Sequence, residues 1–339
     1  MAFQERIIFI VGNSRSGTTM MLRIFNNHSQ LMVLNELHFF EQLWSPSDKG
    51  KIISPHQAVE LASKLMLTQR IGYMTHDQDY IQFNAEASNF VHKINSSNLT
   101  AEYVFNEFTK YEVALNNKSI VCEKTPQNVF YLKEILELYP NAKIINMVRD
   151  PRAILLSQKN KWNRRNLGGN YMTRKEALRL RINYHPITLS QLWNAAINAG
   201  NSLENEPRII SIRFEDLLEQ PQSTIEIICQ HIEVEFDSNM LNITQESSSI
   251  EKDSKEIGFK KERASNWKKG GLNSSERWIC QQQCSKNLSL YHYPIENISP
   301  NYLYLAFYFI SFPIKLGIAF LMNLNRMKNI AETLKRRLK

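Results

Sequence analysis

The segment from Ile7 to Leu22 constrains the fold of this chain more than any other. Five apolar residues, Ile7 to Val11, predict a buried strand. Gly12 and Gly17 then bracket a tight loop, and a helix with an apolar inner face is expected from Thr18 onward. Such a strand, loop and helix point several backbone N–H groups and the positive end of the helix dipole at one place. The segment therefore predicts an α/β fold with a site for a phosphate-like anion.

The cation of this loop does not lie where a nucleotide kinase would have it. The spacing of Gly12 and Gly17 matches the phosphate loop of ATP and GTP enzymes, which have a lysine directly after the second glycine. Here Thr18 occupies that position, and the cation is Arg15, inside the loop. This difference argues against ordinary ATP chemistry and favours another anionic donor.

A second segment supplies further phosphate-binding groups. Residues 143–148 predict a strand, and Arg149 follows it directly. Pro151 suits the first turn of a helix, and Ser157 lies on that helix. Arginine offers a fixed fork of donors for phosphate oxygens, and the serine adds a hydroxyl.

Together, the loop Arg15-Ser-Gly-Thr-Thr19 and the segment Arg149 to Ser157 resemble the two halves of the donor signature of the sulfotransferase family. The resemblance implies an enzyme that moves a sulfuryl group from 3′-phosphoadenosine 5′-phosphosulfate (PAPS). It implies that the 5′-phosphosulfate is held by Arg15, Ser16, Gly17, Thr18 and Thr19, and the 3′-phosphate by Arg149 and Ser157. It extends over roughly 6–40, 119–160, 205–235 and 260–293.

Glu36 is the candidate general base. It follows the predicted strand 31–34, at the carboxyl edge where parallel sheets bind ligands. A partly desolvated carboxylate there can accept a proton, and its place resembles that of the catalytic glutamate of tyrosylprotein and related Golgi-type sulfotransferases. A surface acid at a strand end is the alternative. His38 is the competing base, because cytosolic sulfotransferases use histidine, although its register fits less well.

Lys124 follows another predicted strand, 119–122. Lys124-Thr-Pro126 resembles the family motif whose lysine contacts the transferring sulfuryl group, while an exposed surface lysine is the alternative. Arg15 is expected to contact the bridging and terminal oxygens of the phosphosulfate. No metal is expected, because cationic side chains can meet the charge.

A late segment, Arg263-Ala-Ser265-Asn-Trp267-Lys268-Lys269, resembles the loop that folds over the donor in this family, so Ser265 and Lys268 are candidate donor contacts. The chain departs here from the cytosolic type, since Lys261-Glu-Arg263 precedes the tryptophan and Met20 follows the paired threonines. The departure favours the Golgi-type, tyrosylprotein-like and bacterial branch, and leaves the adenine contacts unassigned.

The predicted fold is α/β: a parallel sheet of about five strands flanked by helices, of the P-loop nucleotide-binding type, with helical insertions. The predicted strands are 6–11, 31–34, 119–122, 143–148 and 208–213. The helical insertions are expected at about 45–118 and 158–205, within a sulfotransferase domain of residues 1–295. The second insertion opens with a basic stretch, Lys159, Lys161, Arg164, Arg165, Gly168 and Gly169. Phe214-Glu-Asp-Leu217 resembles a family motif and is interpreted as structural.

Net charge, cysteine content and the N-terminal segment limit the possible partners and the compartment. The formal net charge of +8 suits an anionic donor or an acidic membrane surface, and no zinc-finger, RRM or recognition-helix pattern indicates nucleic acid. Four scattered cysteines, without a CxxC, indicate reduced thiols. Because the first strand begins within a few residues of Met1, no signal peptide is expected, and the predicted compartment is the cytoplasm.

The tail, residues 296–339, is apolar and then basic. Residues 302–322 just reach the length of a bilayer span, but Pro313 and Lys315 fall near the middle, and a central lysine costs about 3 kcal/mol on insertion. The favoured interpretation is a peripheral anchor at the inner face of a membrane, with a basic flank drawn to anionic lipid. A spanning helix and a segment that packs on the globular domain are the alternatives.

The sequence leaves the acceptor open: a hydroxyl or amine of a glycan, a lipid or a small molecule. The alternatives to a sulfotransferase are a nucleotide-dependent small-molecule kinase and a non-catalytic nucleotide-binding membrane adapter. A kinase would need the lysine that the loop lacks, and the presence of both Glu36 and Lys124 argues against an adapter.

Overall fold

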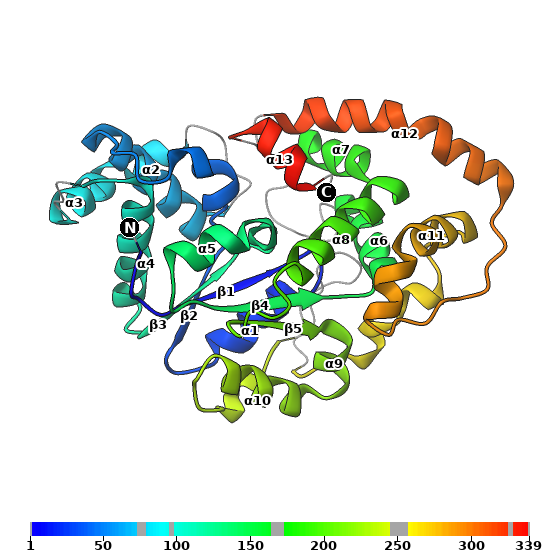
Figure 1. The fold of residues 1–339 in the computed structure, drawn as a ribbon, viewed down its shortest axis with the longest axis horizontal. Coiled ribbons are helices and arrows are strands. Elements are labelled where there is room, and N and C mark those ends of the chain that lie inside the picture. Colours follow the sequence, from blue (N-terminus) through cyan, green and yellow to red (C-terminus); the bar gives the residue numbers. More distant parts are fainter. Residues whose placement is uncertain are drawn as a thin grey trace.

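A five-stranded parallel sheet lies at the centre of the molecule, in the order β2-β3-β1-β4-β5 (Figure 1). The computed structural model describes residues 2–72, 79–94, 98–163, 173–244, 257–324 and 328–337. The strands are β1 (Ile7–Gly12), β2 (Leu31–Leu34), β3 (Ile120–Lys124), β4 (Lys143–Val148) and β5 (Ile209–Arg213). The predicted α/β fold with a parallel sheet of about five strands is confirmed.

The sheet is covered on both faces. Ile7, Phe9 and Val11 of β1 belong to the hydrophobic core on one face, which also contains residues of α2 to α5. Ile8 and Ile10 belong to the core on the other face, with α1, α9 and α10. Because side chains alternate along a strand, a strand covered on both sides is apolar throughout, as β1 is.

The parallel register brings the carboxyl ends of four strands to one edge. Ile10 of β1 is paired with Lys124 at the end of β3, and Gly12 with Met147 near the end of β4. Leu34 at the end of β2 is paired with Glu123. The residues that follow these strands therefore lie at the same edge of the sheet, where open α/β sheets bind ligands.

Helices and short helical turns make up most of the remaining described chain. The helices are α1 (Thr18–Asn26), α2 (Pro55–Arg70), α3 (Asn84–Ile94), α4 (Ala101–Leu115), α5 (Leu132–Leu138), α6 (Pro151–Lys159), α7 (Arg174–Asn183), α8 (Pro186–Asn201), α9 (Phe214–Glu219), α10 (Pro221–His231), α11 (Ser274–Leu290), α12 (Tyr302–Asn323) and α13 (Ile330–Arg337). The turns are η1 (Phe39–Leu43), η2 (Pro46–Asp48), η3 (Asp79–Phe83), η4 (Pro126–Tyr131), η6 (Ser238–Leu241), η7 (Lys261–Ala264) and η8 (Asn266–Lys269).

Both regions expected as helical insertions contain helices. Helices α2, α3 and α4 lie within 45–118, and α7 and α8 within 158–205. Of the basic opening of the second region, Arg164, Arg165, Gly168 and Gly169 lie outside the described residues. The division into a domain of residues 1–295 and a tail stays a prediction.

The C-terminal segment follows the outside of the domain. Helix α12 runs over α7 and α8 and also touches α11 (Figure 1). After it, Lys328 Nζ donates to the Leu43 carbonyl and pairs with Asp48. Helix α13 then lies beside η4 and α8. Both helices of the tail and Lys328 between them thus contact the domain.

Candidate active site

The loop between β1 and α1 requires both of its glycines. The backbone φ is +139° at Gly12 and +100° at Gly17. A Cβ at Gly12 would lie 2.3 Å from the Met147 carbonyl oxygen, and one at Gly17 would lie 2.2 Å from the ring of Phe214. Helix α1 starts at Thr18 with no side-chain cap and no acidic residue in its first turn. Its first N–H groups therefore form a site that favours an anion.

Three of the residues predicted to hold the donor lie together beside this helix start. The Arg15 Nε donates to Ser157 Oγ at 2.9 Å. The Arg149 Nη1 donates to the Arg15 carbonyl oxygen at 3.1 Å. The loop, the end of β4 and helix α6 thus contribute to one cluster of two guanidinium groups and a hydroxyl. Of the other predicted loop residues, Ser16 and Thr18 are buried and Thr19 is exposed.

The guanidinium of Arg149 is held from several sides. Its Nη2 donates to the Arg263 carbonyl oxygen at 3.0 Å, and its Cζ lies 4.3 Å from the centre of the Phe214 ring. Its own carbonyl accepts from Trp193 Nε1 at 3.0 Å. Burial lowers the pKa of Arg149, and the nearby Glu215 opposes that shift. Because arginine starts from a very high pKa, Arg149 remains a cation at neutral pH.

Glu36 and Lys124 form an ion pair at the same edge of the sheet. The Lys124 Nζ donates to Glu36 Oε1 at 2.8 Å. The lysine side chain is 6% exposed and that of Glu36 is 33% exposed. Burial raises the pKa of Glu36, but Lys124 and then His38 outweigh burial and hold it well below its usual range. Glu36 is therefore ionised and is stabilised as an anion.

His38, the competing base, lies between two carboxylates. Its Nε2 is 3.6 Å from Glu36 Oε2, and its Nδ1 is 3.8 Å from Glu41 Oε2. Glu41 is also paired with Arg337 of α13. Burial raises the pKa of Glu41, but Arg337 and His38 outweigh burial and lower it. A chain of ionisable groups thus runs from the C-terminal helix through Glu41 and His38 to Glu36.

A second buried glutamate, Glu123, precedes Lys124 on β3. Its carboxylate accepts from Asn128 Nδ2 at 2.7 Å and from Thr125 Oγ1. The Thr125 Oγ1 in turn accepts from the backbone N–H of His38 at 3.4 Å. Burial raises the pKa of Glu123 to about 7, although the hydrogen bond from Thr125 acts to lower it. Glu123 thus connects the end of β3 with the backbone next to Glu36.

The late loop reaches the arginine cluster through a backbone carbonyl whose role the sequence did not predict. The Arg263 carbonyl of η7 accepts from Arg149, as described above. Within this loop, Lys268 N–H donates to the Ser265 carbonyl at 2.9 Å, and Lys268 Nζ lies 5.6 Å from the Trp267 ring centre. The predicted donor contacts of Ser265 and Lys268 therefore stay predictions.

Phe214 was also missed as a contributor to the site. It follows β5, and its ring touches both Gly17 and the Arg149 guanidinium. The available signal was its position directly after the predicted strand 208–213, at the start of a motif that resembles one of the family. The carbonyl of Arg263 gave no such signal, because any residue type can supply a carbonyl.

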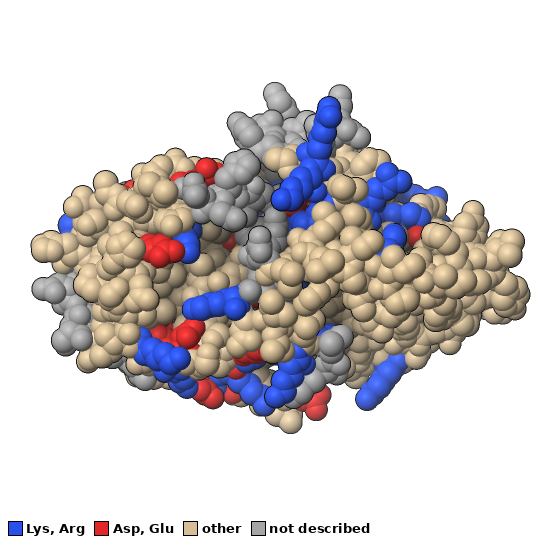
Figure 2. All heavy atoms as spheres, turned by 90° about the horizontal axis from the view of Figure 1, so that it is seen from above, with Lys and Arg blue, Asp and Glu red and all other residues tan. Residues whose placement is uncertain are grey.

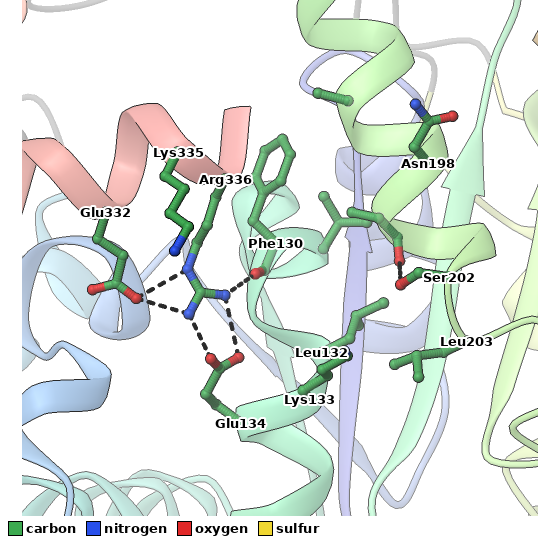
Figure 3. Close-up of a pocket in the computed structure, with 13 residues that line it drawn as sticks. Phe130, Leu132, Lys133, Glu134, Asn198, Ser202, Leu203, Glu332, Lys335 and Arg336 are labelled. Atoms are coloured by element: carbon green, nitrogen blue, oxygen red, sulfur yellow. Dashed lines mark hydrogen bonds and ion pairs between the residues drawn. The ribbon is translucent and has the colours of Figure 1, made fainter. Parts of the chain in front are cut away.

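A pocket of about 480 Å³ lies between η4, α5, α8 and α13. Its apolar lining includes Val129, Phe130, Leu132, Ala195, Ala199 and Leu203. Arg336 of α13 forms one side, where it pairs with Glu134 and Glu332 and donates to the Phe130 carbonyl (Figure 3). A second pocket, of about 320 Å³, lies at the opposite edge of the sheet, beside residues 5–7 and 119–121. The first pocket is therefore the one that adjoins the segment following Lys124.

The described residues hold no group of three or more His, Cys, Asp or Glu side chains that could bind a metal ion. All four cysteines are buried and free of disulfides. They are Cys122, Cys229, Cys280 and Cys284.

The sheet, the glycine loop and the arginine cluster define an α/β protein with an anion site at the carboxyl edge of its strands. A sequence model of the sulfotransferase family matches residues 7–238. The chain belongs to this family and is an enzyme of the sulfotransferase class, as predicted.

The proteins similar to this chain include two relatives and two solved structures. A Caenorhabditis briggsae protein with a provisional protein-tyrosine sulfotransferase name is 24% identical over 245 residues, which cover 70% of this chain and 69% of the relative. A Caenorhabditis elegans protein with the same provisional name is 26% identical over 155 residues, 44% of this chain and 55% of the relative. The sulfotransferase domain of the Synechococcus PCC 7002 olefin synthase is 18% identical, with a TM-score of 0.51 over 87% of this chain and 98% of the domain. The sulfotransferase domain of the curacin biosynthetic pathway is 19% identical, with a TM-score of 0.50 over 85% and 98%. The two structures share the fold with this chain.

Proposed function

We propose that this sulfotransferase moves the sulfuryl group of PAPS to a hydroxyl or amine of a glycan, lipid or small-molecule acceptor. One observation carries the proposal. A cluster of Arg15, Arg149 and Ser157 lies beside the anion-favouring start of α1. At the same edge of the sheet, Lys124 at the end of β3 forms an ion pair with Glu36.

The residues of the cluster suit a donor that is anionic at two ends. Arg15 and residues 16–19, with the N–H groups at the start of α1, would hold the phosphosulfate, because the loop and the helix dipole favour negative charge there. Arg149 and Ser157 would hold the 3′-phosphate through charge-assisted hydrogen bonds. Ser265 and Lys268 of the late loop would add contacts from the other side. PAPS supplies the activated sulfuryl group.

Lys124 and Glu36 have complementary roles in the proposed transfer. The acceptor oxygen or nitrogen forms a bond to sulfur while the bond from sulfur to the phosphate oxygen breaks, and the acceptor proton goes to Glu36. Lys124 stabilises the negative charge on the sulfuryl oxygens. As long as Lys124 is paired only with Glu36, the carboxylate is a weak base. When Lys124 shares its charge with a bound anion, the pKa of Glu36 should rise and favour proton transfer.

The test is transfer of sulfate from PAPS to a panel of acceptors. The panel contains glycans, lipids and phenols, and a tyrosine-containing peptide because two relatives carry tyrosine sulfotransferase names. We expect transfer to at least one class, at a rate that a metal chelator leaves unchanged. Phosphate transfer from ATP with magnesium in place of sulfate transfer would support a kinase. Donor binding without transfer to any acceptor, under conditions where a family enzyme is active, would support the adapter.

A further inference from the structure

Three polar side chains of α12 contact the protein. Lys315 Nζ donates to the Tyr184 carbonyl at 3.2 Å, and Tyr308 OH accepts from Asn273 Nδ2 at 3.0 Å. Asn323 Nδ2 donates to Asn183 Oδ1 at 2.9 Å. Tyr308, Lys315 and Asn323 lie on one face of the helix, since multiples of three to four residues separate them. This face binds α7 and the segments next to it.

The opposite face of α12 is apolar and exposed. Leu303 is 84% exposed, Phe307 58%, Ile310 72%, Ile314 62% and Leu321 66%. These residues also recur at spacings of three, four and seven, so they form one continuous stripe. A helix on the surface of a water-soluble domain normally has the reverse arrangement, with its apolar stripe against the core. The stripe is therefore suited to an apolar environment outside the protein.

The contacts of the inner face favour a helix that lies flat on a membrane. Among the described residues, α12 is the one helix that is long and apolar enough to span a bilayer by length and composition. Spanning would separate Lys315 from the Tyr184 carbonyl and place its charge in hydrocarbon, which is costly. With the helix lying in the membrane plane, all three inner-face hydrogen bonds persist while the outer stripe enters the lipid.

Positive charge lies along the same side of the molecule. Helix α7 packs against α12 and exposes Arg174, Lys175 and Arg181. Lys335 of α13 is also exposed. The view from above shows a broad uncharged surface over α12 with lysine and arginine side chains gathered beside it (Figure 2). In an anionic membrane surface, acidic headgroups lie above the hydrocarbon. The apolar stripe suits the hydrocarbon, and the basic residues beside it suit the headgroups.

We propose that α12 docks in the plane of an anionic lipid membrane, with its apolar stripe in the interface and the basic residues of α7 among the headgroups. This inference does not depend on the proposed donor or acceptor. It assigns the enzyme to the inner face of a membrane, where anionic lipids are concentrated.

The experiment uses the full chain and vesicles of phosphatidylcholine with or without phosphatidylserine. The enzyme should sediment with the anionic vesicles, and less so as salt rises. A variant with Leu303→Gln, Phe307→Gln, Ile310→Gln and Ile314→Gln should bind them more weakly by about 100-fold or more, because four apolar side chains that enter the lipid are lost. A variant with Arg174→Gln, Lys175→Gln and Arg181→Gln should bind vesicles with phosphatidylserine more weakly than the unchanged enzyme does, by about tenfold or more. Its binding to vesicles without phosphatidylserine should be unchanged.

A matched control replaces exposed apolar residues elsewhere: Ile52→Gln, Ile81→Gln, Leu115→Gln and Ile227→Gln. This control should bind vesicles as the unchanged enzyme does. A cooperative thermal melt near the melting temperature of the unchanged enzyme shows that each variant is folded. Equal binding by the stripe variant and the control would overturn the proposal. A second result would also overturn it: the unchanged enzyme self-associates and does not bind vesicles, and the stripe variant no longer self-associates. The stripe would then bind a second copy of the chain.

Discussion

Glu36 is the residue on which the proposed chemistry depends. Glu36→Gln keeps the shape of the side chain and removes its capacity to accept a proton. We expect turnover to fall by about 100-fold or more, with donor binding nearly unchanged. Steady-state kinetics with PAPS, together with the melting temperature in adenosine 3′,5′-bisphosphate, measure the two effects separately. Full turnover in this variant, with loss of turnover in His38→Ala, would assign the base to His38.

Arg149 should matter for donor affinity. Its guanidinium is held in place by the Arg15 and Arg263 carbonyls and by the Phe214 ring. Arg149→Ala should weaken binding of adenosine 3′,5′-bisphosphate by about 100-fold, since a charge-assisted fork is lost. Calorimetry measures the change, with Arg174→Ala on the surface of α7 as the control. An equal loss in both variants would mean that only net charge matters.

Glu123 should make the stability of the protein depend on pH. Its pKa is raised by burial from 4.5 to about 7, so the folded state holds this proton more tightly than the unfolded state. The stabilisation is complete below pH about 4.5 and is lost as the pH rises through about 7. Between these values the free energy of unfolding should fall by on the order of 3 kcal/mol in the unchanged protein relative to Glu123→Gln.

Urea unfolding at several pH values measures this difference. Glu60→Gln, which removes a carboxylate from the surface of α2, is the control and should follow the unchanged protein. If the curves of Glu123→Gln and the unchanged protein stay parallel, Glu123 is ionised in the folded state throughout.

At the scale of single residues, the sequence indicated where a side chain would lie in the fold better than which side chain it would contact. Arg15, Arg149 and Ser157 were expected near one donor, and hydrogen bonds join Arg15 to both of the others. Glu36 and Lys124 were each expected at the carboxyl edge, but strand ends alone do not reveal that the two form an ion pair. Their side chains come from strands separated by more than eighty residues, so no local spacing could show it.

At the scale of elements, the glycine loop is the least tolerant part of the site. Gly17→Ala should both strain the backbone and push against the Phe214 ring, which supports Arg149. We expect a loss of about 1–3 kcal/mol in stability and a loss of donor binding. Unfolding and binding measurements on the same variant test both effects.

Gly72→Ala is the matched control for this change. Its φ is +110°, close to that of Gly17, but a Cβ there would meet nothing within 4 Å. It should therefore lose stability through backbone strain alone and keep donor binding. Equal effects of the two substitutions on binding would contradict the role given to Phe214.

The strands were predicted almost to their observed ends, because each is a short apolar run between helices. Residues 31–34 and 143–148 match β2 and β4 at both ends, and the other three strands are displaced by one or two residues. The order of the strands was not predictable in the same way. It depends on which helices cover which face, and crossovers of different lengths satisfy the same local pattern.

At the scale of the whole molecule, the donor should stabilise the fold. Adenosine 3′,5′-bisphosphate at about 100 times its dissociation constant should add roughly 2.7 kcal/mol to the free energy of unfolding. ATP should add far less, because the arginine cluster replaces the lysine that an ATP loop needs. A thermal melt with each nucleotide makes the comparison. Equal stabilisation by ATP with magnesium would argue against a PAPS site.

The path of the tail was beyond sequence reasoning. Composition indicated an apolar helix with a basic end, and it left open whether the segment spans, lies on a membrane or packs on the domain. The structure shows that α12 packs on the domain with its polar face, and that Arg336 and Arg337 pair with Glu134 and Glu41. These carboxylates belong to distant segments, so the contacts follow from tertiary structure alone.

The central position of β1 also determines when the chain can fold. This strand, Ile7–Gly12, is made before the other four strands of the sheet. Both of its neighbours, Ile120–Lys124 and Lys143–Val148, are made more than a hundred residues later. Until then its apolar side chains have no strands to pair with, and pairings between distant segments are slow to form. The phosphate loop that directly follows β1 therefore takes shape late, and a nascent chain that ends before β4 should depend on chaperones to remain unaggregated.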